Sequence, residues 1–153
     1  MMSIEVKLAP EISRKVGNAC LCFQTQRAAR ALARHFDEVF RPLGITNGQF
    51  SLMMSLNRPD GAPTMQQVAD SLAMDRTTLT AALKPLERRG LVAVTVDERD
   101  RRNRRLSLTP AGHRLLTEAV PLWETEHDAV EARLGGIDAD SLRDALRAIS
   151  ALG

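Results

Sequence analysis

The stretch TMQQVADSLAMDRTTLTAALKPLERRGLVAVTVDERDRRNRRLSLT, residues 64–109, decides the fold of this chain. It predicts a short helix, a tight turn, a second helix and a two-stranded hairpin with an arginine-rich tip. Thr64 and Gln67 have the spacing of a capping box, which marks the start of the first helix. Asp75 is a good N-cap for the second helix, and Gly90 suits the left-handed cap at its end. Two short helices joined in this way are typical of a helix-turn-helix.

The second helix is predicted to have two different faces. Leu79, Leu83 and Leu86 recur at helical spacing and indicate a stripe that faces a core. The opposite stripe is polar and contains Thr77, Thr80, Lys84 and Arg88. A solvated face is the usual explanation of such a stripe, but threonines are mediocre helix formers and need another reason in this first part of the helix. Arginine and threonine side chains at a helix N-terminus suit phosphates and base edges in a major groove.

A hairpin is predicted directly after this helix. Residues 91–96 are rich in β-branched side chains, and residues 106–108 alternate like the partner strand. The connection between them is too highly charged to be buried, with five arginines in the seven residues from Arg99 to Arg105. A narrow minor groove attracts such side chains; the alternative is a solvated loop whose arginines contact no partner. Together these elements predict a winged helix.

Helices are also expected on both sides of the winged helix. After an arm at residues 1–10, apolar side chains near helical spacing predict one long helix over 11–40. Residues 110–134 form another, and a last helix follows it. Their apolar faces have no obvious place on a winged helix, whereas a two-fold dimer would bury them. We therefore expect a mainly α fold with a small β-wing, in three regions: an N-terminal arm and dimerisation helix at 1–43, a winged helix-turn-helix at 44–110, and C-terminal dimerisation helices at 111–153.

Composition suits one folded domain with an oligomerisation element, because 44% of the 153 residues are apolar and 26% are charged. The net charge of +2 does not by itself indicate nucleic acid, but positive charge is concentrated at 84–89 and 99–105. Without a signal peptide or a long apolar run, a cytoplasmic protein with no membrane contact is expected. No phosphate loop, nucleophile elbow or metal-ligand spacing is present, so the sequence predicts no enzyme, no cofactor and no metal site.

Three motifs stand in order along the chain: Asp75-Arg76-Thr77-Thr78-Leu79-Thr80, the run Leu86-Glu87-Arg88-Arg89-Gly90-Leu91-Val92, and Asp100-x-Arg102 ahead of Leu106-x-Leu108-Thr109-x-x-Gly112. In order and spacing they resemble the MarR-type transcriptional regulators, over nearly the whole chain. The resemblance implies a homodimer, formed by the first and last two helices, that binds a pseudo-palindromic operator in double-stranded DNA. It also implies a repressor that releases DNA when a small, often aromatic or anionic, molecule binds.

Site residues follow from the same resemblance. Asp100 would orient a wing arginine, and Arg102 would enter the minor groove. The expected DNA contacts are Gln66, Arg76, Thr77, Thr78, Thr80, Lys84, Arg88, Arg99, Arg101, Arg102 and Arg104. The effector pocket would be lined by Phe36, Phe50, Met53, Met54 and Trp123, although core packing explains each of these residues as well.

Two other functions compete with this one. Cys22-Phe23 with Arg30 is similar to the first helix of the organic-hydroperoxide sensors in the same family, which makes Cys22 a candidate redox residue. Those sensors also use tyrosines, which this chain lacks, so a buried and unreactive cysteine is the competing interpretation. A disulfide with Cys20 is not expected on a continuous helix, since residues two apart point to different sides. The other alternative is a winged helix that only binds proteins.

Overall fold

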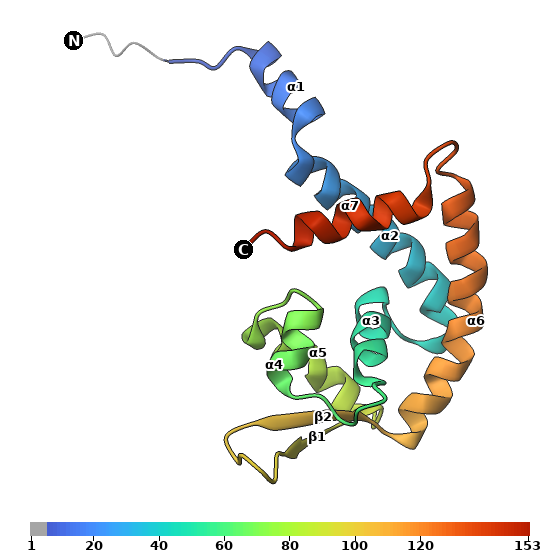
Figure 1. Ribbon diagram of the computed structural model, residues 1–153. Coiled ribbons are helices and arrows are strands. Elements are labelled where there is room, and N and C mark those ends of the chain that lie inside the picture. The colour runs from blue at the N-terminus through green and yellow to red at the C-terminus, as the bar shows by residue number, and fades with distance from the viewer. Residues whose placement is uncertain (1–5) are drawn as a thin grey trace.

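The computed structural model describes residues 6–153, so the first five residues of the predicted arm lie outside the described residues. The elements in chain order are α1 (Pro10–Ala19), α2 (Leu21–Phe40), the 3-10 turn η1 (Arg41–Leu43), α3 (Asn47–Leu56), α4 (Met65–Ser71), α5 (Arg76–Arg88), β1 (Val92–Val96), β2 (Arg104–Leu108), α6 (Pro110–Ala132) and α7 (Ala139–Ser150) (Figure 1). Helices dominate, and the two strands pair antiparallel as a wing. The predicted fold class is confirmed.

The helix-turn-helix forms where the sequence predicts it, because each boundary has a local signal. Thr64 and Gln67 make both bonds of the capping box at the start of α4. Asp75 caps α5, where its Oδ1 accepts a hydrogen bond from the Thr78 N–H at 2.8 Å. Gly90 follows α5 with a φ of +69°, which is the left-handed conformation that glycine adopts without strain. The core is then completed by the predicted apolar stripe of α5, namely Leu79, Leu83 and Leu86.

The residues that precede α4, Pro63 and Thr64, lie along the second edge of β2 and extend the hairpin. β1 and β2 pair from Val92 with Leu108 to Val96 with Arg104. On the far side of β2, the Leu106 N–H donates to the Pro63 carbonyl at 2.9 Å, and Thr64 forms a bridge with Arg105. The wing is therefore fixed to the segment that leads into α4.

The start of α6 packs closely against the winged helix at Gly112. Thr109 caps α6 by accepting from the Gly112 N–H, and its hydroxyl donates to the Gly90 carbonyl at 2.6 Å. A Cβ at Gly112 would lie 2.2 Å from the Leu91 carbonyl oxygen. Only glycine permits this approach of helix to strand, and it joins α6 rigidly to the wing.

The prediction of one helix over 11–40 was wrong, because the helix is interrupted at Cys20. This residue has extended backbone angles (φ −72°, ψ 114°), and its Sγ accepts from the Phe23 N–H at 3.4 Å as the N-cap of α2. No glycine or proline marks the break. The break is stabilised locally, because the Cys20 N–H donates to the Val16 carbonyl at the end of α1 and the Cys20 side chain caps α2. α1 itself buries no residue, and in Figure 1 it extends beyond the rest of the chain.

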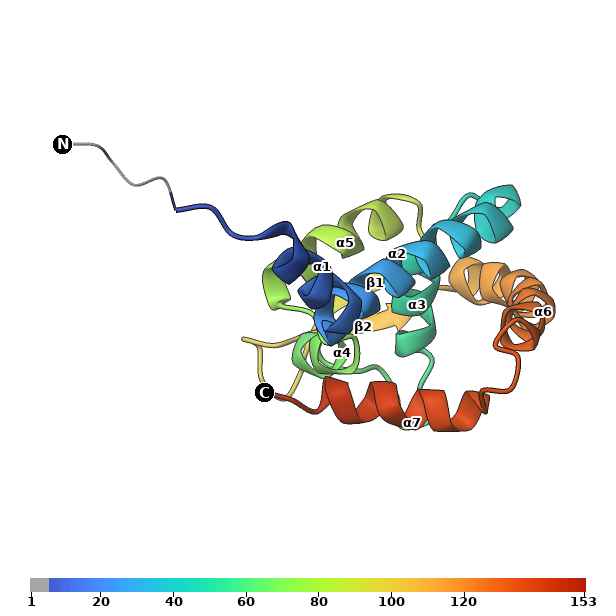
Figure 2. The ribbon, with the colours of Figure 1, turned by 90° about the horizontal axis from the view of Figure 1, so that it is seen from above.

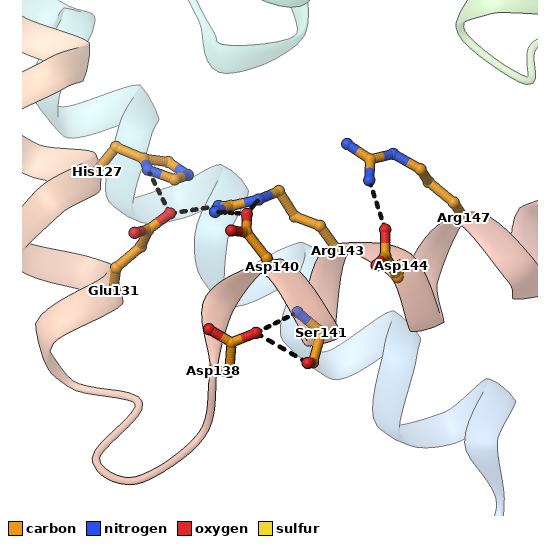
Figure 3. Close-up of polar contacts among 8 residues, drawn as sticks. All are labelled: His127, Glu131, Asp138, Asp140, Ser141, Arg143, Asp144 and Arg147. Atoms are coloured by element: carbon orange, nitrogen blue, oxygen red, sulfur yellow. Dashed lines mark hydrogen bonds and ion pairs between the residues drawn. The ribbon is translucent and has the colours of Figure 1, made fainter.

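At the other end of the chain, a loop connects α6 to α7, which runs along one side of the molecule (Figure 2). Figure 3 shows the polar cluster at this corner, where Arg143 of α7 pairs with Glu131 of α6 and with Asp140 of its own first turn. These two partners, Asp140 first, raise the pKa of Arg143. Asp138 caps α7 through the Ser141 N–H at 2.9 Å. Like α1, α7 buries no residue in the single chain.

The terminal helices leave apolar faces open. The exposed side chains are Ile12 and Val16 on α1, Leu21, Phe23 and Leu32 on α2, and Leu142, Leu146 and Ile149 on α7. A groove of about 620 Å³ runs between α2, α6 and α7, and its lining is mainly apolar. None of the helices within residues 6–153 has the length and apolar character that a membrane crossing requires. In the single protomer these apolar faces remain exposed.

Candidate nucleic-acid interface

The outer face of α5 is polar and open to solvent. All six of its predicted contact residues are exposed: Arg76, Thr77, Thr78, Thr80, Lys84 and Arg88. The charged cap Asp75 lies beside them, and the hydrogen bonds that it accepts from the Thr78 N–H and hydroxyl hold its pKa below the usual value. Within the described part of the chain, no ion pair engages the cationic side chains of this face. They are free to meet an anionic partner.

The three threonines of this face differ in the hydrogen bonds that their hydroxyl groups can still make with a partner. The Thr78 hydroxyl donates to Asp75 Oδ2, and the Thr80 hydroxyl donates to the Arg76 carbonyl, each at 2.8 Å. Both protons are therefore committed to the helix, and only the oxygen lone pairs remain available. Thr77 makes no such bond among residues 6–153, so its hydroxyl can both donate and accept. Of the three, Thr77 has the most capacity to read a base edge.

The wing tip presents one arginine on a carboxylate support. Asp100 accepts from Arg102 Nε at 3.1 Å and from Nη2 at 3.3 Å, and also from the Arg102 N–H. These bonds, the side-chain bond first, hold the pKa of Asp100 below its usual value. The Arg102 side chain is nevertheless 90% exposed. Its guanidinium is held along one edge, which reduces its rotational freedom while the rest of the group faces solvent.

The remaining predicted DNA contacts lie on the wing and at the start of α4. Arg99, Arg101 and Arg104 are exposed on the wing. Arg104 Nη1 donates to the Arg101 carbonyl at 3.1 Å, which bends this side chain back along the loop. Gln66 is exposed in the first turn of α4, where its amide donates to Asp70 at 2.8 Å.

Arg105 is the residue that sequence reasoning left without a role. Its guanidinium points toward the root of the wing, donating to the Ala62 carbonyl at 2.8 Å and to Asp97 at 3.3 Å. The available signal was weak: Arg105 directly precedes the buried strand residue Leu106, unlike the arginines of the tip. One partner, the Ala62 carbonyl, lies 43 residues earlier in the chain, too far for local reasoning to find it.

The residues expected to form an effector pocket are mostly part of the core. Phe36, Phe50 and Met53 are buried, and Phe50 stacks on Phe40 with ring centroids 4.5 Å apart. Trp123 is half-buried and stacks on His127 at 4.7 Å. Met54 alone of the five is exposed, and it lines a cavity of about 320 Å³ between α3 and α6. Of the five predicted residues, Met54 is thus the one that lines this cavity.

Both cysteines are free thiols near the break between α1 and α2. Cys22 is exposed in this chain, which contradicts the interpretation of a buried cysteine, and its Sγ accepts from the Gln26 amide at 3.1 Å. The reason given against a disulfide also fails, because Cys20 has extended backbone angles and the two residues do not share one continuous helix.

Comparison with known proteins points to one family. A family model described as MarR family matches residues 43–103, which cover the core of the winged helix. The solved structure of the M. tuberculosis transcriptional regulator MosR in complex with DNA is similar, with 37% sequence identity and a TM-score of 0.77. The likeness covers 86% of this chain and 93% of that one.

Two curated relatives are also similar to the chain. It is 29% identical over 102 residues to the organic hydroperoxide resistance transcriptional regulator of Bacillus subtilis, covering 67% of this chain and 69% of the relative. It is 34% identical over 94 residues to the transcriptional activatory protein BadR of Rhodopseudomonas palustris, covering 60% of this chain. The match spans only 54% of the length of BadR, so this likeness is confined to part of that protein.

Proposed function

The chain belongs to the MarR family of winged-helix transcription regulators, which are not enzymes, and from this premise we propose that it is a homodimeric repressor acting on a pseudo-palindromic DNA operator in the cytoplasm. The proposal rests on the exposed face of α5, whose cationic side chains form no ion pair within residues 6–153, and on the wing that follows it and presents Arg102. No cofactor is needed for this activity.

The two features contact different grooves in the proposed complex. The N-terminal part of α5 lies in a major groove, where Arg76 and Thr77 meet base edges and the remaining residues of the stripe support them. Lys84 and Arg88, further along the helix, bind phosphates. Arg102 enters the neighbouring minor groove, while Arg99, Arg101 and Arg104 neutralise the backbone beside it. Gln66 at the start of α4 also meets a phosphate.

The partner chain is a second copy of this protein. Its terminal helices would bury the open apolar faces of α1, α2 and α7 and fill the groove beside α7. Charge supports the same arrangement. α2 carries Arg27, Arg30 and Arg34, and α6 carries Glu118, Glu124 and Asp128. Both sets are exposed and without ion pairs inside the described protomer, so a second copy supplies counter-charges to each. Two α5 helices about one helical turn of DNA apart would follow.

Repression is the expected outcome because two winged helices cover successive grooves and exclude other proteins from that DNA. An aromatic or anionic effector would relieve it by changing the angle between α3 and α6, at the cavity that Met54 lines. Two contacts would transmit such a change. Asp37 of α2 accepts from the Asn47 N–H at 2.7 Å, and Arg89 after α5 donates to the Gly44 carbonyl. Movement of α2 therefore reaches the start of α3 and, through the turn at Gly44, the end of α5.

Selection of DNA from a pool of random duplexes tests the proposed function. We expect the protein to enrich one pseudo-palindrome, and we expect its affinity to fall steeply with salt because several phosphates are neutralised on each half-site. Enrichment of no sequence, together with a stable protein partner whose binding is insensitive to salt, would instead identify a protein-interaction module.

Thiol sensing is a second candidate, favoured by the exposure of Cys22 and by the likeness to the B. subtilis organic hydroperoxide regulator. A sensor cysteine needs a group that activates its sulfur, and the chain contains no tyrosine. The neighbour that bonds to Cys22 Sγ is the neutral Gln26 amide.

We therefore expect stoichiometric organic hydroperoxide to leave operator binding unchanged. Binding should be measured before and after treatment, in the wild type and in Cys22→Ser. If peroxide releases DNA from the wild type alone and dithiothreitol restores binding, the protein is a redox regulator.

A further inference from the structure

Arg105 has the surroundings of a structural residue, although it belongs to the most cationic stretch of the chain. Its side chain is 35% exposed, whereas that of Arg102 at the tip is 90% exposed. Both ends of its guanidinium are occupied, Nη1 by the Ala62 carbonyl at 2.8 Å and Nη2 by Asp97 Oδ2 at 3.3 Å. Two of the five guanidinium N–H donors are therefore engaged inside the protein, toward the root of the wing.

Asp97 is a buried carboxylate at the point where the tip loop leaves β1. Its side chain is 9% exposed. Oδ1 accepts from the Arg99 N–H at 3.1 Å, and the Asp97 N–H donates to the Asn103 carbonyl at 3.0 Å, so this residue closes the loop on both sides. A buried carboxylate without a counter-charge is costly, and Arg105 provides the counter-charge here.

The same arginine connects the wing to the helix-turn-helix. Ala62 and Pro63 lead directly into Thr64, the N-cap of α4, and the Leu106 N–H donates to the Pro63 carbonyl. The Arg105 guanidinium thus bridges the root of the hairpin and the segment before α4. Arg102 lies three residues beyond this root, at most about 10 Å away along the chain. A rotation of the root by about 10° would move the Arg102 backbone by up to roughly 2 Å.

We propose that Arg105 and Asp97 are a positioning pair that sets the wing tip at its correct place relative to α5, and that Arg105 itself contacts no DNA. The inference rests on the proposed DNA-binding function, which it deepens by separating the arginines that bind DNA from the one that aims them. Arg105 acts through Arg102, whose place in the minor groove depends on the direction of the hairpin root.

Charge makes the pair testable, because removing each partner changes the net charge in opposite directions. Arg105→Ala loses a positive charge and Asp97→Asn loses a negative charge. A purely electrostatic role predicts that the first weakens DNA binding and the second strengthens it. The positioning role predicts that both weaken operator binding, by about tenfold each, which is within the range of one displaced base-edge contact. Affinity for unrelated DNA should change little.

The dependence of operator affinity on salt gives a second readout. A lost phosphate contact lowers the slope by about 0.9 per contact, and a lost positioning contact leaves it unchanged. Arg104→Ala, on the exposed neighbour, is the matched control and should lower the slope. Arg105→Lys keeps the charge opposite Asp97 and should recover part of the operator affinity. Thermal unfolding of each variant identifies any that simply fail to fold, and Arg105→Lys then serves as the test variant.

A double-mutant cycle with Arg102→Ala completes the test. If Arg105 acts by aiming Arg102, Arg105→Ala has less than about a twofold further effect once Arg102 is absent. Additive losses, a lowered slope for Arg105→Ala, or tighter binding by Asp97→Asn would each overturn the inference while leaving the proposed function intact. Failure of the wild type to bind any operator would overturn both.

Discussion

Replacing both Leu142 and Leu146 by aspartate is expected to lower operator affinity by about 100- to 10,000-fold, although neither residue is near the DNA-binding face. Both side chains are exposed on α7, which buries nothing in the single chain, so the protomer should stay folded. In the proposed dimer they are buried against the second copy, and two aspartates there would be left without partners. Each winged helix would then bind one half-site alone and lose the high effective concentration that linkage provides.

Sedimentation and operator titration together measure this effect. The wild type should sediment at about twice the protomer mass of 16.8 kDa, and the double variant at that mass. Arg147→Asp, which adds negative charge at an exposed position about 120° around the same helix from the stripe of Leu142 and Leu146, is the control and should remain dimeric and bind tightly. A double variant that is still dimeric and still binds the operator would show that α7 is not part of the interface.

Arg102→Ala should have the next largest effect, a loss of roughly 1–3 kcal/mol for each of the two wings. The guanidinium is held by Asp100 and is 90% exposed, so it is already oriented and its removal leaves no cavity in the fold. Stability should therefore be unchanged while operator binding falls.

Two variants of α5 separate the kinds of contact. Lys84→Ala should lower affinity for every sequence and flatten the salt dependence by about 0.9 per protomer, as for a phosphate contact. Thr77→Ala should relax the sequence preference, because its hydroxyl is the one not engaged within the described protomer.

If Arg102→Ala binds the operator as tightly as the wild type, the wing does not enter the groove.

The winged helix was predictable because each of its boundaries has a local signal. The capping box at Thr64, the cap at Asp75 and the glycine at Gly90 each act on residues within four positions. Hydrophobic spacing then identified the buried face of α5, since Leu79, Leu83 and Leu86 share one side of a regular helix.

Features that depend on distant packing escaped sequence reasoning. The break at Cys20 has no glycine or proline to announce it, and α1 buries no residue in the single chain. The inward direction of Arg105 is decided by the Ala62 carbonyl, 43 residues earlier in the chain. Composition alone counts Arg105 with the arginines of the tip, although it is half-buried in an ion pair with Asp97.

The central claim is that two copies of this chain read one operator with paired α5 helices. Footprinting of the operator complex, with its mass measured on the same sample, tests this most directly. We expect two chains per duplex and two protected half-sites whose centres lie about 10 base pairs apart, with minor-groove protection beside each. One chain per duplex, or protection without two-fold symmetry, would contradict the account.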